Sequence, residues 1–192
     1  AGTIGTLIGY SVSKNRRNKW ANYVNGVAFL PYLMPSIAVG VAFFIMFSNE
    51  TINLFNTYTL LIIAGTVKYI PFASRSSLNS MLQLSNEIEE AAIIHGIPWH
   101  KRMLSIIIPI QKSSIISGYL LPFMTCLREL SLFILLCTQG FIVATSLDYF
   151  DEMGLYAFSS AINLILIIII LVCNALVNKI TGASLDKGIG GN

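Results

Sequence analysis

Few side chains in this sequence have the chemistry of a catalytic or metal-binding group. The two histidines, His95 and His100, could bind a metal or transfer protons, but their spacing would put them on different faces of one helix. Gly96 and Pro98 also interrupt any helix between them, and the zinc motif H-E-x-x-H is absent. This pattern favours a surface or interface role for both histidines.

The remaining reactive groups do not assemble into a catalytic set either. The three cysteines, Cys126, Cys137 and Cys173, lie in apolar surroundings without metal-ligand spacing, which is typical of small buried side chains. The glycines of "GASLDKGIGGN" match no phosphate-binding loop and predict a mobile tail. We therefore expect neither an enzyme nor a chain with its own metal or cofactor, and we find no signature of nucleic-acid binding.

Three ionisable residues lie inside otherwise apolar stretches: Lys68, Arg128 and Glu129. Charges within a membrane span are costly and mark by default a transport pathway or a buried pair. Arg128 and Glu129 are adjacent, so on a helix they point about 100° apart and favour partners on other helices. Three interpretations stay open: a pair between Lys68 and Glu129, a lining of the aqueous pathway, or an outer-interface position for Arg128 and Glu129.

A polar segment, 79–111, interrupts the apolar chain and contains "EEAAIIHGIPWHKRMLSIIIPI". Asn86 can cap a helix whose first turn carries Glu87, Glu89 and Glu90, where the helix dipole favours carboxylates. Gly96 suits the position after the helix end, and Pro98 follows it. The sequence predicts a helix of about two to three turns, with a small apolar face formed by Ile88, Ala91, Ala92 and His95. Such a face would let a cytoplasmic partner approach closely.

The same segment resembles a known motif. Glu90-Ala91-Ala92, Gly96, Ile106 and Ile108-Pro109 have the spacing of the EAA motif, E-A-A-x3-G-x9-I-x-L-P, of permease subunits in ATP-binding-cassette importers. Only the leucine differs, because Ile108 stands in its place. The flanking sequences, "YIPFASRSSLNSMLQLSNEIEEAA" and "LRELSLFILLCTQG", are similar to the ferric-iron permease branch, and the likeness covers about residues 20–178. One departure is Gln139, where related sequences tend to have proline before glycine.

The resemblance implies an all-α polytopic permease core of about five helices, with segment 79–111 as a cytoplasmic coupling loop. Matched by position, Glu90, Ala91, Ala92 and Gly96 would dock a cytoplasmic ATP-binding subunit, which binds the ATP. Ile106 and Pro109 would join this surface to the next span. The implied partners also include an extracytoplasmic substrate-binding protein and a second permease half.

Composition agrees with a membrane protein, and the bilayer would be a further partner. Of the 192 residues, 55% are hydrophobic and 11% are charged, against about 25% charged in an average soluble domain. Apolar runs of about 20 residues are long enough to cross a bilayer. We expect a partial helix at 1–13 and spans near 24–48, 57–78, 112–137 and 155–178, with 138–154 as an outer-face loop or re-entrant helix.

The distribution of charges predicts the orientation. The expected cytoplasmic face carries Lys14, Arg16, Arg17, Lys19, Arg75, Lys101, Arg102, Lys112, Lys179 and Lys187, whereas the other face carries Glu50, Asp148, Asp151 and Glu152. Basic residues are retained on the cytoplasmic side, so the coupling loop and the C-terminus are expected there, in a bacterial inner membrane. The abrupt start at "AGTIGTLIGY" suggests that residues 1–192 form a single permease domain, a fragment or the C-terminal half of a longer permease.

Ferric iron is the first expectation for the substrate, with thiamine, a polyamine or another small solute as alternatives. An ATP-independent secondary transporter is a further alternative, which ATP-independent uptake would favour. A simple membrane anchor would explain the hydropathy but not the EAA spacing. Within the first helix, "GTLIG" (Gly5 to Gly9) is a GxxxG pattern that permits close helix packing.

Overall fold

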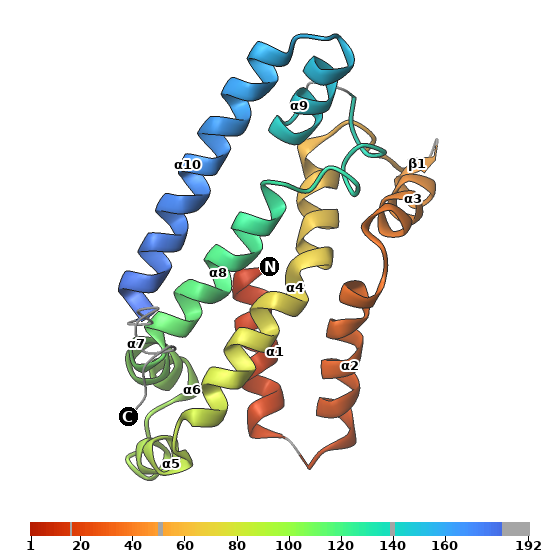
Figure 1. Ribbon diagram of the computed structural model, residues 1–192. Coiled ribbons are helices and arrows are strands. Elements are labelled where there is room, and N and C mark those ends of the chain that lie inside the picture. The colour runs from red at the N-terminus through yellow and green to blue at the C-terminus, as the bar shows by residue number, and fades with distance from the viewer. Residues whose placement is uncertain (16, 50–51, 139–140, 182–192) are drawn as a thin grey trace.

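The computed structural model describes residues 1–15, 17–49, 52–138 and 141–181, with side chains up to Lys179. The expectations for Arg16, Glu50, Gln139, Lys187 and the tail 182–192 fall outside these residues. The described chain is mostly helical, as the sequence predicts, with one short hairpin formed by β1 (Ser48–Asn49) and β2 (Ile52–Asn53). Figure 1 shows the helices as an elongated bundle.

Helices α1 (Gly2–Lys14) and α4 (Tyr58–Gln83) form the centre of this bundle. The GxxxG glycines of α1 lie directly against α4: a β-carbon at Gly5 would be 2.4 Å from the β-carbon of Ala73, and one at Gly9 would be 2.7 Å from the Leu78 nitrogen. The predicted close packing is therefore confirmed. The expected helices 1–13 and 57–78 are also present, and the second continues to Gln83.

The expected span at 24–48 is not one continuous helix. The chain forms α2 (Lys19–Leu33) and α3 (Ser36–Phe47), which meet at an angle of 103°. Met34 and Pro35 between them are extended, with ψ of 136° and 139°. Proline cannot donate a backbone hydrogen bond and disfavours a helical residue before it, so Pro35 ends α2 at this point.

The expected span at 112–137 is also too long, because α8 (Lys112–Cys126) ends before Arg128. Residues 127–137 form turns packed against α3 and α4, with Leu132 and Leu136 fully buried beside Leu60 and Val39. Irregular backbone at membrane depth is tolerated where protein buries it. An apolar run of this kind predicts burial, but it does not separate a helix from a buried series of turns.

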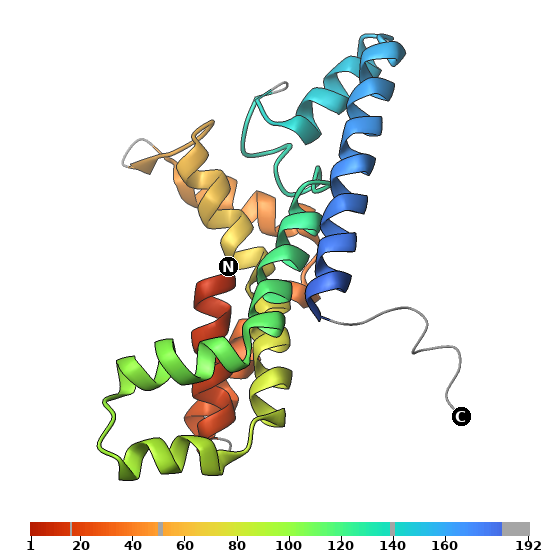
Figure 2. The ribbon, with the colours of Figure 1, turned by 90° about the vertical axis from the view of Figure 1, so that its left-hand side faces the viewer.

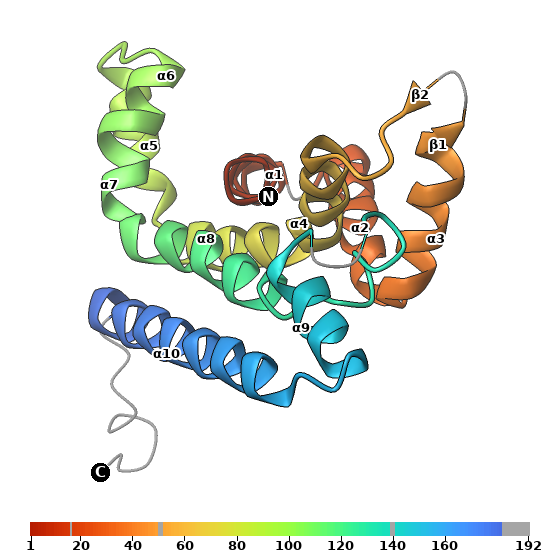
Figure 3. The ribbon, with the colours of Figure 1, turned by 90° about the horizontal axis from the view of Figure 1, so that it is seen from above.

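Residues 141–154 include the short helix α9 (Val143–Glu152), which leads to α10 (Tyr156–Thr181). Gly154, with φ of +71°, lies in the turn between them. Helix α10 agrees with the expected span 155–178 and lies alongside α8, on the side of the bundle away from α2 (Figure 3).

By length and hydropathy, α10 is the one described helix that could cross a membrane unbroken. Two bent pairs also qualify if each is counted as one span: α2 with α3, and Trp99–Ile110 with α8. The second pair bends by 81°.

The polar segment forms a chain of short helices at one end of the bundle. After α4 come α5 (Asn86–Ile94), α6 (Trp99–Arg102), the π-helical turn η1 (Met103–Ile107) and α7 (Ile108–Ile110). Figure 2 shows them running out from the end of α4 and returning to α8. Because α4 continues to Gln83, we use the name coupling loop for residues 86–110, a part of the expected segment 79–111.

Candidate functional site

Helix α5 begins one residue earlier than the expected capping places it. Its N-cap is Ser85, whose hydroxyl accepts a hydrogen bond of 3.3 Å from the Glu87 amide, and not Asn86. Ser85 is extended, whereas Asn86 is the first helical residue and accepts from the Lys14 ammonium at 3.1 Å. Serine and asparagine cap equally well, so the sequence does not choose between the two neighbours.

The end of α5 has the predicted geometry. Gly96 adopts φ of +69°, which glycine tolerates best. Its amide donates to the Ile93 carbonyl at 2.9 Å, and the Ile97 amide donates to the Ala92 carbonyl at 3.0 Å. These two bonds form a Schellman motif, which fixes how the chain leaves the helix. Pro98 then precedes α6.

The residues of the EAA motif divide between two faces. Ala92 is buried, with 5% of its surface exposed, and therefore packs within the chain. Glu90, Ala91 and Gly96 are exposed, as is Ile94, which is 84% exposed. Of the four residues expected to form the small apolar face, Ala92 is therefore buried, whereas Ile88, Ala91 and His95 are exposed. Ile106 is half-buried in η1, and Pro109 is exposed in α7, just before α8.

Glu89 forms a buried polar centre that the sequence reasoning missed. The side chain is 7% exposed, and its Oε2 lies 2.7 Å from the Lys14 ammonium. Tyr10 donates its hydroxyl to Oε1 at 2.5 Å, and Arg102 Nε lies 3.8 Å from the same oxygen. Helix capping, the interpretation that the first-turn position favours, does not account for these partners. Helical periodicity places Glu89 three residues before Ala92 on one face, but it does not tell whether that face packs within the chain or against a partner.

The charges around Glu89 determine its protonation. Burial would raise the pKa of this carboxyl group. The hydrogen bonds from Lys14 and Tyr10 and the charges of Lys14 and Arg102 outweigh that effect and hold the pKa below its ordinary value. Glu89 is therefore ionised at neutral pH, as its salt bridges require.

Lys68 lies at the break between α2 and α3. It is 8% exposed, and its ammonium donates to the Met34 carbonyl at 2.6 Å and to the Pro31 carbonyl at 3.0 Å. The last carbonyls of a helix have no partner within the helix and carry partial negative charge. A lysine therefore stabilises the C-terminal end of α2, and Lys68 forms no direct pair with Glu129.

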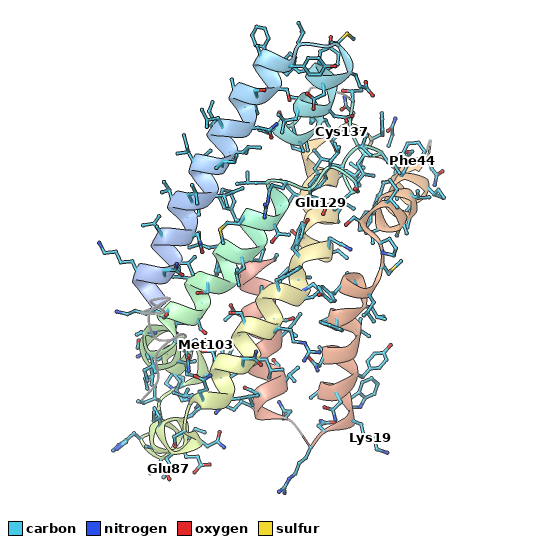
Figure 4. The ribbon with its side chains drawn as sticks, in the orientation of Figure 1. Lys19, Phe44, Glu87, Met103, Glu129 and Cys137 are labelled. Atoms are coloured by element: carbon cyan, nitrogen blue, oxygen red, sulfur yellow. The ribbon has the colours of Figure 1, made fainter. Side chains whose placement is uncertain are left out.

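Glu129, labelled in Figure 4, contacts the first residue of α3, the helix that follows the break. Its Oε2 accepts from the Tyr69 hydroxyl at 2.6 Å and the Ser36 hydroxyl at 3.3 Å, and its Oε1 accepts from the Leu132 amide at 3.1 Å. Ser36 is the first residue of α3, so the carboxylate lies near the positive end of that helix.

Arg128 points elsewhere. It is exposed and lines a hollow together with Asp148, Asp151 and Asn163, from α9 and α10. The Arg128 and Glu129 side chains do point in different directions, but they do so from turns and not from the expected helix. Arg128 faces α9 and α10, and Glu129 faces α3 and α4.

The groups first considered for metal chemistry lie apart. His95 and His100 are both exposed in the coupling loop, and Cys137 is buried, whereas Cys126 and Cys173 are half-buried. Among the described residues, no three His, Cys, Asp or Glu side chains are grouped so that they could hold a metal ion.

Comparison with known families decides the class of protein. Residues 3–184 match the family described as binding-protein-dependent transport system inner membrane component. The chain belongs to this family. Its members are transmembrane components of transport systems, which are not catalytic and bind no cofactor.

Three relatives give further context. The chain is 25% identical, over 70% of its length, to a putative ferric transport system permease protein FbpB 1 of Haemophilus influenzae. It is 24% identical, over 87% of its length, to the ferric transport system permease protein FbpB of Actinobacillus pleuropneumoniae. It is also 27% identical, over 80% of its length, to the molybdate/tungstate transport system permease protein WtpB of Pyrococcus abyssi.

The chain spans only part of these relatives: 21% and 24% of the two ferric permeases and 60% of the molybdate/tungstate permease. The substrates in the names of these relatives, ferric iron and molybdate or tungstate, differ in charge.

Proposed function

We propose that this chain is the permease unit of an ATP-driven importer and that the exposed face of α5 docks a cytoplasmic ATP-binding subunit. The observation that supports this is the arrangement of the coupling loop. Its exposed residues Glu90, Ala91, Gly96 and Ile94 lie at the end of the bundle, on a helix fixed at both ends by its caps. An exposed isoleucine on a rigid helix is suited to a groove on a partner.

Around this docking contact we place the rest of the transporter. A second permease half would complete the translocation pathway, and an extracytoplasmic binding protein would deliver the solute. The coupling loop and the C-terminus would face the cytoplasm, because basic residues cluster there. Ile106 and Pro109 would transmit movement of the docked helix into α8, which follows them directly.

Ferric iron is the proposed substrate, supported by the two relatives named as ferric permeases. A molybdate or tungstate oxyanion is the second candidate, supported by the archaeal relative. Uptake of radiolabelled ferric ion and of molybdate by the assembled transporter separates them. ATP-dependent uptake of iron alone supports the first, uptake of molybdate alone selects the second, and uptake without ATP contradicts the importer class.

Docking is tested at Ala91 and not at Ala92, because arginine at the buried Ala92 would disturb the loop itself. Ala91→Arg is expected to release the ATP-binding subunit during co-purification, since a small-residue contact accommodates neither the volume nor the charge. Ala91→Ser, which keeps a small side chain, is the matched control. Retention of the ATP-binding subunit and of uptake by Ala91→Arg would show that this face is not the docking surface.

A further inference from the structure

A buried carboxylate of the coupling loop contacts α1, beside the hydrogen bond from Lys14 to Asn86 and the apolar contacts of Tyr10. Glu89 of α5 contacts Tyr10 and Lys14 of α1 on one side and Arg102 of α6 on the other. The Lys14 and Arg102 side chains are themselves only 22% and 16% exposed. Glu89 thus joins α5 and the neighbouring α6 to α1, which is distant in the sequence.

The covalent connections of α5 are weaker constraints. The extended residue Ser85 precedes the helix, and the turn at Gly96 follows it. The caps fix the two ends of the helix itself, but they do not fix the position of the helix relative to α1. The ion pair between Glu89 and Lys14 opposes movement of α5 away from α1, because removing one partner would leave an uncompensated buried charge.

Movement of α1 would be transmitted further. Tyr10 packs in a buried cluster with Met81 of α4 and with Met103 and Ile107 of η1. Beyond it, Gly9 and Gly5 hold α1 against α4 without space for a β-carbon, and α4 carries Lys68 at the break between α2 and α3. The packed contacts run without interruption from the coupling loop to the middle of the bundle.

We propose that Glu89 is the positioning residue that transfers displacement of the docked coupling loop to α1. This role rests on the proposed docking of an ATP-binding subunit, but it is separate from docking, because Glu89 faces the chain and not the partner. Glu90 and Ala91 would form the contact, and Glu89 would pass its movement inward.

The test uses the assembled full-length transporter and measures amide hydrogen exchange with and without a non-hydrolysable ATP analogue. In the unmodified protein the analogue is expected to change exchange in both α5 and α1. In Glu89→Gln the response of α5 and the bound ATP-binding subunit should remain, while the response of residues 2–14 is lost. Glu87→Gln, an exposed neighbour on the same helix, should behave as the unmodified protein.

A second variant distinguishes lost transmission from unfolding of the coupling loop. Lys14→Gln removes the ion pair from the α1 side, together with the Lys14 bond to Asn86, and leaves the sequence of α5 intact. The double variant should transmit no less than Lys14→Gln alone. An unchanged α1 response in Glu89→Gln and Lys14→Gln would overturn the proposal. Release of the ATP-binding subunit by both variants would also overturn the proposal, because Glu89 would then only stabilise the loop.

The results that would contradict the proposed docking differ from those that would contradict the role of Glu89. If the unmodified chain never binds an ATP-binding subunit, or if Ala91→Arg leaves binding unchanged, docking on α5 is wrong. Normal docking with an α1 response independent of Glu89 contradicts only the inference about Glu89.

Discussion

Lys68 and Glu129 show why two opposite charges within one bundle need not pair. The break between α2 and α3 creates a negative helix end at Pro31 and Met34 and a positive one at Ser36. Each charge lies at the end of opposite sign and forms hydrogen bonds there. The local partners are therefore sufficient to explain why both residues are tolerated at this depth.

Replacing Lys68 tests this role. Lys68→Met keeps much of the side-chain volume but leaves the carbonyls of Pro31 and Met34 without their donor. We expect the free energy of unfolding in detergent to fall by about 2 kcal/mol, the usual cost of unsatisfied buried groups. Lys112→Met, at an exposed position, is the control and should be close to neutral. An equal effect of both changes would contradict the role of Lys68.

A charge exchange distinguishes separate sites from a direct pair. Glu129→Lys should impair uptake, because an ammonium would face the positive end of α3. Adding Lys68→Glu should not restore uptake and should worsen it, since a carboxylate would then face the carbonyl end of α2. Restored uptake in the double variant, measured at equal membrane abundance, would show that a direct pair forms during transport.

The pH dependence of the coupling loop follows from Glu89. Its pKa is lower in the folded protein than in the unfolded chain, so its contribution to stability is complete above the unfolded value. As the pH falls through the folded pKa, that contribution is lost. The difference in melting temperature between the unmodified protein and Glu89→Gln should stay constant from about pH 8 to pH 5 and shrink below about pH 4. A difference that changes near neutral pH would contradict this assignment.

At the scale of elements, the contact between α1 and α4 depends on glycine. Gly5→Ala would place a methyl group 2.4 Å from the Ala73 β-carbon, so the helices would have to separate. We expect a loss of about 1–3 kcal/mol in the free energy of unfolding, as for other overpacked sites. Gly26→Ala in α2, where a β-carbon meets nothing within 4 Å, should be neutral or stabilising. Thermal unfolding of both variants measures the difference.

The sequence predicts elements whose signal is local. The positions of α1, α4 and α10 follow from apolar runs, and the end of α5 follows from Gly96, which needs a positive φ. Pro35 indicates a break in the helix at Met34, but the continuous hydropathy across 24–48 favours one unbroken span, and the structure has the break. The turns at 127–137 and the burial of Glu89 depend on distant partners, namely α3, α4 and α1, which no local pattern contains.

At the scale of the whole molecule, the proposed orientation can be measured. In a chain whose native cysteines are replaced by alanine, Met153→Cys and His100→Cys mark the two ends, both at exposed positions. A membrane-impermeant maleimide should label position 153 from outside intact cells, and position 100 only after permeabilisation. The reverse pattern would place the coupling loop outside and contradict ATP-driven coupling from the cytoplasm.

The unequal hydropathy of the helices has a consequence for biogenesis. Helix α10 is apolar and almost wholly exposed, so it can partition into a bilayer by itself. Helix α4 carries Lys68, and a lysine at the centre of an isolated inserting helix costs roughly 2.5–3.5 kcal/mol. The carbonyls that compensate this cost belong to α2, which is synthesised first. Helix α4 is therefore expected to leave the translocon as a hairpin with α2 and α3, whereas α10 can enter the lipid alone and assemble last.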